Sequence, residues 1–361
     1  MIKSNIALTG LDSTENPYPG LSVLRSIKNS GEFEGKVVAL TYDSLCTGLY
    51  RHDLIDEVYL IPYPSEPEEF LFSRIVEINN KTKIEVIIPC LDSEIATYAR
   101  LSQRLKEIGI NVFVPKEDAV KARSKLFLKE FCDKNNLNYP KSFFVNDPNQ
   151  IDGHSATLHY PLFLKGSIID SVKVDNPTEA HVFFNRLANE WGLPLILQES
   201  LDGEEYDVVV LANRESKITA KVAMKKIGLT SRGKAFAGVT VSSREFDDLA
   251  ETVVKALNWQ GPLELELMKN TNLNKVYIIE INARFPTWVY ATVGAQLNLP
   301  LLNLKLALGQ KIDSLPDYKK GVMFARIFED SFCDVNYLAQ LNIKGEIDWN
   351  KAKNTTKGLL I

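Results

Sequence analysis

Continuous apolar runs alternate with amphipathic segments along the first third of the chain. The runs centred on NIAL, KVVALTY, EVYLIP, IEVIIPC and INVFVP have no polar face, whereas apolar residues recur at helical spacing in the segments between them. Strands without a polar face are typical of parallel sheets that helices cover on both sides. The pattern therefore predicts an N-terminal doubly wound parallel-sheet α/β domain over residues 1–118.

The pattern changes after residue 118, where helices are followed by short strands. The segments YPLFLKGS, LPLILQESL and EEYDVVVLAN are interpreted as strands of an antiparallel or mixed sheet, with a helix over residues 178–191 between the first two. Farther along, the spacing predicts helices over residues 244–258 and 293–308 and a strand in GVMFARIFE. The second part of the chain is thus expected to be α+β.

Composition narrows the class of protein. The net charge of −4 over 361 residues gives no basic surface for nucleic acid or anionic lipid, and no apolar run is long enough for a membrane span. The start of the chain turns polar too soon for a signal peptide. The cysteines lack metal-ligand spacing and are interpreted as reduced thiols of a cytoplasmic protein. They are Cys46, Cys90, Cys132 and Cys333.

A predicted hairpin in GPLELELMKNTNLNKVYIIEINARF carries several polar side chains on one face. Because strand side chains alternate between the two faces, Glu280, Asn282 and Arg284 share a face. With the turn in the link KNTNLNK, Glu266 lies opposite Glu280, and Glu264 lies opposite Asn282. Any pairing in this register gathers carboxylates on one face.

Directly opposed carboxylates destabilise a sheet unless something offsets their charge. Three explanations stand side by side: a solvated face, a shared proton, or a divalent cation. Magnesium binds one or two carboxylates and completes its coordination with water and substrate phosphates, and the Asn282 amide oxygen suits such an ion. Arg284 then lies where its planar fork can hold a phosphate oxygen.

The order of these residues resembles the metal-binding end of the ATP-grasp superfamily, which includes carbamoyl-phosphate synthetase, biotin carboxylase and D-alanine–D-alanine ligase. The resemblance implies two phosphate-binding lysines, which match Lys125 in ARSKLFLKEF and Lys165 in YPLFLKGS. It also implies a hinge strand at the adenine and an acid at the ribose, which match LILQESLDGEEYDV. The matching positions are Gln198, Glu199 and Leu201 for adenine, and Glu205 for ribose.

The resemblance implies that the α/β domain is followed by a two-subdomain ATP-grasp fold. A lid subdomain is expected over residues 119–200, and a C-terminal subdomain with the metal site and tail over residues 201–361. Two features depart from the family pattern. The segment that covers the phosphates, residues 166–173, contains only Gly166, and Ala283 follows the asparagine where relatives often have proline.

The implied cofactors are ATP and two magnesium ions, with manganese as the alternative metal. Glu266, Glu280 and Asn282 are the implied metal ligands, while Arg284 and Lys225 are the implied catalytic residues. The implied reaction phosphorylates a carboxylate and joins it to an amine, with an amino acid or peptide as substrate.

Further expectations concern activity, the acceptor pocket and assembly. One alternative is a carboxylase or carbamoyl-type enzyme that phosphorylates bicarbonate, and another is a catalytically weak nucleotide-binding module. Trp288 and Tyr290 either wall the acceptor pocket or pack beneath the helix at 293–308. The N-terminal domain and the tail offer a face for a homodimer.

Overall fold

The protein is described by a computed structural model that covers residues 1–166, 170–231 and 233–355. The chain divides into two compact units. The first consists of Met1–Glu117, Val208–Glu264 and Asn282–Ile361, and the second of Asp118–Asp207 and Leu265–Ile281. The expected boundaries at residues 118 and 200 stay predictions.

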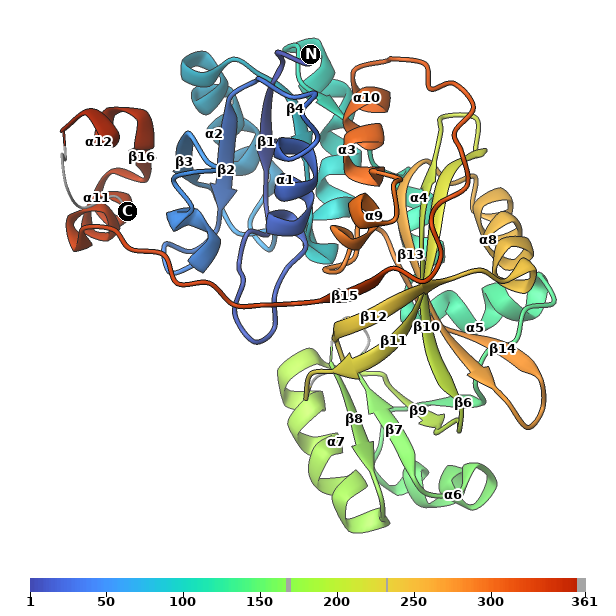
Figure 1. Cartoon of the computed structure of the whole chain (residues 1–361). Helices are drawn as coiled ribbons and strands as arrows, with labels where there is room; N and C mark the ends of the chain where they lie inside the picture. Colours follow the sequence, from blue (N-terminus) through green and yellow to red (C-terminus); the bar gives the residue numbers. More distant parts are fainter. Residues whose placement is uncertain (167–169, 232, 356–361) are drawn as a thin grey trace. The chain divides into compact units, whose positions relative to one another are not determined.

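A six-stranded sheet forms the N-terminal part of the first unit (Figure 1). Its order is β16 (Glu346–Asp348), β3 (Glu57–Leu60), β2 (Val37–Thr41), β1 (Asn5–Leu8), β4 (Ile84–Ile88) and β5 (Asn111–Val112). The five N-terminal strands are parallel, and β16 joins β3 in the antiparallel direction. Every residue of β2 is buried, as expected for a strand with no polar face.

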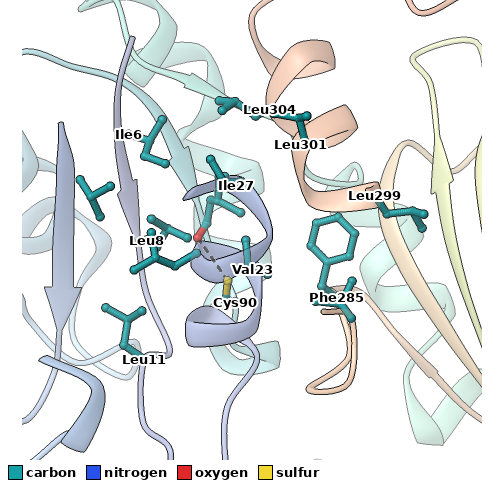
Figure 2. Close-up of a cluster of buried hydrophobic side chains, with 14 of the residues drawn as sticks. Ile6, Leu8, Leu11, Val23, Ile27, Cys90, Phe285, Leu299, Leu301 and Leu304 are labelled. Carbon is teal, nitrogen blue, oxygen red and sulfur yellow. Dashed lines mark hydrogen bonds between the residues drawn. The ribbon is translucent and has the colours of Figure 1, made fainter. Parts of the chain in front are cut away.

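Helices bury both faces of this sheet, which confirms the predicted fold class. Ile6 and Leu8 of β1 belong to the same apolar cluster as Val23 and Ile27 of α1, and Figure 2 draws these side chains together. Ala7, on the opposite face, is also fully buried. The helices of this part are α1 (Gly20–Lys28), the 3-10 helix η1 (Thr47–Tyr50), α2 (Glu68–Thr82) and α3 (Asp92–Glu107).

The C-terminal tail returns to the N-terminal sheet and supplies its edge strand. It consists of α11 (Val335–Lys344), β16 and α12 (Trp349–Thr355). Trp349 is fully buried, and its indole N–H donates to the carbonyl of Leu49 at 3.1 Å. The tail is therefore an integral part of the first unit.

A second six-stranded sheet has mainly antiparallel neighbours. Its order is β14 (Lys275–Asn282), β13 (Gly261–Asn270), β10 (Glu204–Ala212), β11 (Ile218–Leu229), β12 (Ala235–Val241) and β15 (Met323–Ala325). The strands β10, β13 and β14 contribute residues to both units. The amphipathic helix α8 (Arg244–Ala256) follows β12 and lies within the range predicted from its spacing.

The helix expected over residues 293–308 is two helices, α9 (Ala291–Gly294) and α10 (Leu299–Ala307). Gln296 adopts a positive φ of 64°, which ends the helical path. Asn298 then caps α10 by accepting from the amide of Leu301 at 3.1 Å, and Pro300 occupies its first turn. Proline is tolerated there but breaks a helix interior, so the break follows from the local sequence.

The second unit contains a four-stranded antiparallel sheet with its own core. The order is β6 (Ser142–Val145), β9 (Leu195–Glu199), β7 (Leu162–Lys165) and β8 (Ser171–Val174). One face of this sheet packs against α6 (Asn149–Leu158) and α7 (Pro177–Trp191) through a cluster that includes Leu164, Phe184 and Leu197. The unit also holds α4 (Glu117–Ala122) and α5 (Lys125–Lys134).

The second-unit sheet also corrects one expectation. Three segments were expected to share a sheet, but EEYDVVVLAN forms β10 of the other sheet. Among the described residues, no helix is both long enough and apolar enough to cross a bilayer.

Candidate functional site

The four-stranded sheet of the second unit has a second, more polar face. Because side chains alternate, the residues between those of the apolar cluster point away from α6 and α7. Phe163 and Lys165 of β7 are on this face, and they pair with Gln198 and Ile196 of β9 respectively. Lys165 is only 7% exposed and Gln198 only 1%. Both side chains are therefore almost completely shielded from solvent.

Four of the predicted site residues gather in the second unit. The ammonium of Lys125, at the start of α5, lies 3.7 Å from a carboxylate oxygen of Glu280. The charges of Lys125, Glu280 and Glu266 all act on the buried ammonium of Lys165. The two predicted phosphate lysines and two predicted metal carboxylates are thus brought together, although the sequence places them on four separate elements.

Burial disfavours the protonated form of Lys165. Desolvation, and next the positive charge of Lys125, lower the pKa of Lys165 to about 8, and Glu280 and Glu266 offset only part of this effect. Two ammonium groups held close together in a dry environment favour an added anion. This arrangement fits a polyphosphate, whose charge would restore the protonated form of Lys165.

The two carboxylates also fit a magnesium ion. Magnesium takes only one or two protein carboxylates and fills the rest of its coordination with water and phosphate oxygens. Within the described part of the chain, no group of three or more His, Cys, Asp or Glu side chains forms a metal site of its own. The predicted ligand set therefore depends on Glu266 and Glu280, with Asn282 two residues beyond Glu280 on β14.

The predicted hinge residues lie where β9 leads into β10. Gln198 and Glu199 end β9, Leu201 lies in the link that follows, and Glu205 is a half-buried residue at the start of β10. A Cβ on Gly203 would lie 2.4 Å from the carbonyl oxygen of Lys269, so only glycine allows the link to approach β13 this closely.

The side chain of Glu199 has a partner on the neighbouring strand. Its carboxylate accepts the backbone N–H of Lys141 at 2.7 Å, and its own N–H donates to the carbonyl of Lys141 at 2.9 Å. These bonds fix the end of β9, where the adenine-binding backbone groups are expected.

The remaining predicted residues belong to the first unit. Arg284 donates from Nη1 to Glu264 Oε2 at 2.7 Å and from Nε to Asp92 Oδ2 at 2.8 Å. Asn282 Nδ2 donates to the same Glu264 oxygen at 3.0 Å. This bond agrees with the predicted register, in which Glu264 lies opposite Asn282. Lys225 lies on β11, opposite Val239 of β12.

The loop expected to cover the phosphates lies partly outside the described residues. Positions 167–169 are not described, so this prediction is not tested.

Two alternatives were predicted for Trp288 and Tyr290, and Trp288 is a packed residue. It is 2% exposed, and its indole N–H donates to Glu264 Oε1 at 3.2 Å. The Tyr290 hydroxyl accepts from Asn29 Nδ2 at 2.8 Å.

Sequence reasoning missed Asp92 and Arg326. Asp92 is the first residue of α3, shortly after the end of β4, and an acid near the carboxyl end of a parallel strand was a usable signal. Arg326 follows β15 and donates to the carbonyl of Thr287 at 2.8 Å, but its Nη1 is buried without a hydrogen-bond partner among the described residues. Desolvation lowers the pKa of Arg326. No feature of the local sequence predicted that Nη1 of Arg326 would lack a partner within the described part of the chain.

The structure thus combines a parallel-sheet domain, two further sheets, and a cluster of two lysines and two glutamates in the second unit. The fold is similar to that of ATP-grasp enzymes, and part of the chain matches an ATP-grasp family model. Residues 193–329 match the family described as "ATP-grasp in the biosynthetic pathway with Ter operon".

Several solved structures share the fold at low sequence identity. N5-carboxyaminoimidazole synthetase from Staphylococcus aureus is 16% identical with a TM-score of 0.64, over 95% of this chain and 98% of that chain. L-amino acid ligase from Bacillus licheniformis is 18% identical with a TM-score of 0.63, over 85% and 74%.

A carboxylase and a curated protein complete the comparison. The biotin carboxylase domain dimer of Hydrogenobacter thermophilus 2-oxoglutarate carboxylase, in complex with MgADP, ADP and bicarbonate, is 16% identical with a TM-score of 0.66, over 87% and 71%. Protein pellino of Drosophila melanogaster is 23% identical over 163 residues, which make up 44% of this chain and 37% of pellino. The chain thus matches well under half the length of that curated protein.

Proposed function

We propose that the protein is an ATP-dependent ligase that activates a carboxylate as an acylphosphate and joins it to an amine. The observation that carries this proposal is the meeting of Lys125, Lys165, Glu266 and Glu280 within one compact unit. Two cations beside two acids suit the phosphate and metal ends of MgATP. We place the enzyme in the cytoplasm, because all four cysteines are free thiols.

Each predicted binding residue has a proposed task. Lys125 and Lys165 neutralise the phosphates, and Glu266 and Glu280 hold magnesium, with Asn282 as a further oxygen ligand. When bound, the metal supplies positive charge to the phosphate oxygens. Gln198, Glu199 and Leu201 present the hinge to the adenine. Glu205 accepts hydrogen bonds from the ribose hydroxyls.

The proposed reaction has two steps that balance without an added cofactor. A substrate carboxylate oxygen attacks the γ-phosphorus of ATP, which gives an acylphosphate and ADP. The amine then attacks the acyl carbon, and inorganic phosphate leaves. Such phosphoryl transfer depends mainly on positioning and charge stabilisation. Arg284 and Lys225 are proposed to bind the transferring group.

Arg326 is proposed to bind the substrate carboxylate. Its guanidinium is largely buried and lacks an acidic partner among the described residues, and burying an unpaired charge is costly. A carboxylate would provide the missing charge and accept from the buried Nη1. The likeness to L-amino acid ligase agrees with an amino acid or peptide substrate, although it shows the fold alone.

The second candidate is a carboxylase that phosphorylates bicarbonate. The observation that favours it is the likeness to the biotin carboxylase domain described with MgADP and bicarbonate. That neighbour is also a dimer, in agreement with the homodimer proposed for this chain. A weak nucleotide-binding module remains the third candidate because of the glycine-poor segment at residues 166–173.

The test is an ADP-release assay with purified protein, ATP and magnesium. Candidate amino acids and short peptides are added singly and in pairs, with bicarbonate in a separate arm. ADP release that requires a carboxylate, with the ligated product found by mass spectrometry, supports the ligase. ADP release driven by bicarbonate alone supports the carboxylase. ATP binding without ADP release in either arm contradicts both enzymes.

A further inference from the structure

Glu264 is a buried carboxylate at the centre of a hydrogen-bond network in the first unit. It is 4% exposed and accepts from Asn282 Nδ2, from Arg284 Nη1 and from the indole N–H of Trp288. Two of these donors belong to residues with proposed tasks in binding and catalysis. The network therefore connects a proposed metal ligand to a proposed catalytic arginine.

The chemistry of a carboxylate determines which way the Asn282 amide points. An ionised carboxylate can only accept hydrogen bonds, so the amide nitrogen must face Glu264. The amide oxygen of Asn282 is then turned away from Glu264. This is the orientation in which Asn282 offers an oxygen, the only atom of its side chain that binds magnesium.

Glu264 also sets the plane of the Arg284 guanidinium. Its bond to Nη1 and the bond from Nε to Asp92 come from two different segments, β13 and the start of α3. Because the guanidinium is planar, two acids at two of its nitrogens fix its orientation. The side chain of Arg284 is 15% exposed, which limits other rotamers.

We propose that Glu264 is a positioning residue that orients Asn282 for metal binding and Arg284 for the transferring phosphoryl group. This inference rests on the proposed function, and it adds a residue that holds the ligands without touching the metal. Residues that orient metal ligands typically affect metal affinity by about 10–100-fold when changed. A purely structural role would affect stability and leave metal affinity alone.

The variant Glu264→Gln tests this role with little change in volume. One end of the glutamine is a donor, so it opposes the N–H groups that face Glu264 and favours rotation of the Asn282 amide. Manganese is titrated into protein with ADP present, and the free ion is measured by electron paramagnetic resonance. We expect manganese affinity to fall about tenfold or more. Unchanged affinity would overturn the proposal.

A double variant provides a matched rescue. In Glu264→Gln/Asn282→Asp, the glutamine N–H can donate to one aspartate oxygen while the other oxygen stays available for the metal. We expect manganese affinity to return to within about threefold of wild type, since the ligand orientation is restored. A double variant that binds manganese no better than Glu264→Gln contradicts the proposal. If the single variant does not fold, a loss of manganese affinity above about tenfold in the double variant, relative to wild type, contradicts the proposal.

Two controls separate this inference from the proposed function. Trp288→Phe removes the N–H donor at Oε1 together with part of the ring, keeps the donors from Asn282 and Arg284, and should leave manganese affinity close to wild type. Glu280→Gln should weaken manganese binding directly. If wild-type protein does not bind manganese with ADP, the proposed function fails. If wild type binds and Glu280→Gln weakens it while Glu264→Gln changes only the melting temperature, the positioning role alone fails.

Discussion

Lys165 should take up a proton when ATP binds. In the unliganded protein, burial and Lys125 lower its pKa to about 8, so roughly half of the molecules carry a neutral Lys165 at pH 8. A bound triphosphate stabilises the ammonium and raises this pKa towards its ordinary value of 10.5. Binding at pH 8 should therefore be accompanied by the uptake of about half a proton.

Isothermal titration calorimetry in buffers of different ionisation enthalpy measures this uptake. Phosphate groups have a second pKa near 6, so ATP itself hardly titrates at pH 8–9.5. ATP affinity should fall by up to about tenfold per pH unit above pH 8, because a proton must bind first. In Lys165→Met the uptake should vanish, whereas in the exposed control Lys134→Met it should persist. Heats of wild type that do not depend on the buffer at pH 8 would refute this reasoning.

The same pKa shift makes a prediction for the unliganded protein. Between pH 8 and 10.5 the unfolded chain holds a proton on Lys165 that the folded protein has released. The free energy of unfolding should therefore rise with pH through this range, by roughly 3 kcal/mol at most for this residue. Urea titrations of wild type against Lys165→Met isolate the contribution. If the difference in unfolding free energy between the two proteins stays constant from pH 8 to 10.5, the lowered pKa of Lys165 is contradicted.

Two further substitutions test other parts of the account. Arg326→Met should raise KM for the carboxylate about 10–100-fold, the value of a hydrogen-bonded charge. The melting temperature should change little, because the lost bond to the Thr287 carbonyl is offset by removal of a desolvated guanidinium whose Nη1 has no partner among the described residues. Unchanged KM in steady-state assays would exclude Arg326 as a carboxylate ligand. Trp349→Ala removes a fully buried indole that anchors the tail and should cost about 3–5 kcal/mol in denaturant unfolding. Amide hydrogen exchange in this variant should accelerate first in β16 and β3. Exchange rates that change equally in all strands, with an unchanged free energy of unfolding, would show that the tail is not an anchored strand.

The N-terminal sheet could be predicted from sequence because its strands are buried on both faces. Such strands appear as uninterrupted apolar runs, and all five parallel strands were found this way. The edge strand β16 was missed because two of its three residues are acids, so it is not an apolar run. Its partner β3 also lies near the opposite end of the sequence, so no local pattern indicates the pairing. The break between α9 and α10 was missed although Asn298 and Pro300 mark it locally.

The site was partly predictable for a similar reason. Alternation along β13 and β14 predicted that Glu264 and Asn282 would meet, and their hydrogen bond agrees with that register. The second acid that holds Arg284, Asp92, lies 192 residues away in sequence, so only the fold brings it near. Arg326 was missed because its significance comes from a buried Nη1 that has no hydrogen-bond partner among the described residues, which no sequence pattern reveals.

The central claim is that Glu266 and Glu280 hold a magnesium ion for a nucleotide whose phosphates contact Lys125 and Lys165. The most direct measurement is ATP affinity by calorimetry as a function of magnesium concentration. It compares wild type with Glu280→Gln and with the control Glu190→Gln, which changes an exposed glutamate on α7. The account predicts that magnesium tightens ATP binding in wild type and in the control, and that Glu280→Gln loses most of this gain while its melting temperature stays within a few degrees. Equal magnesium dependence in all three proteins would contradict it.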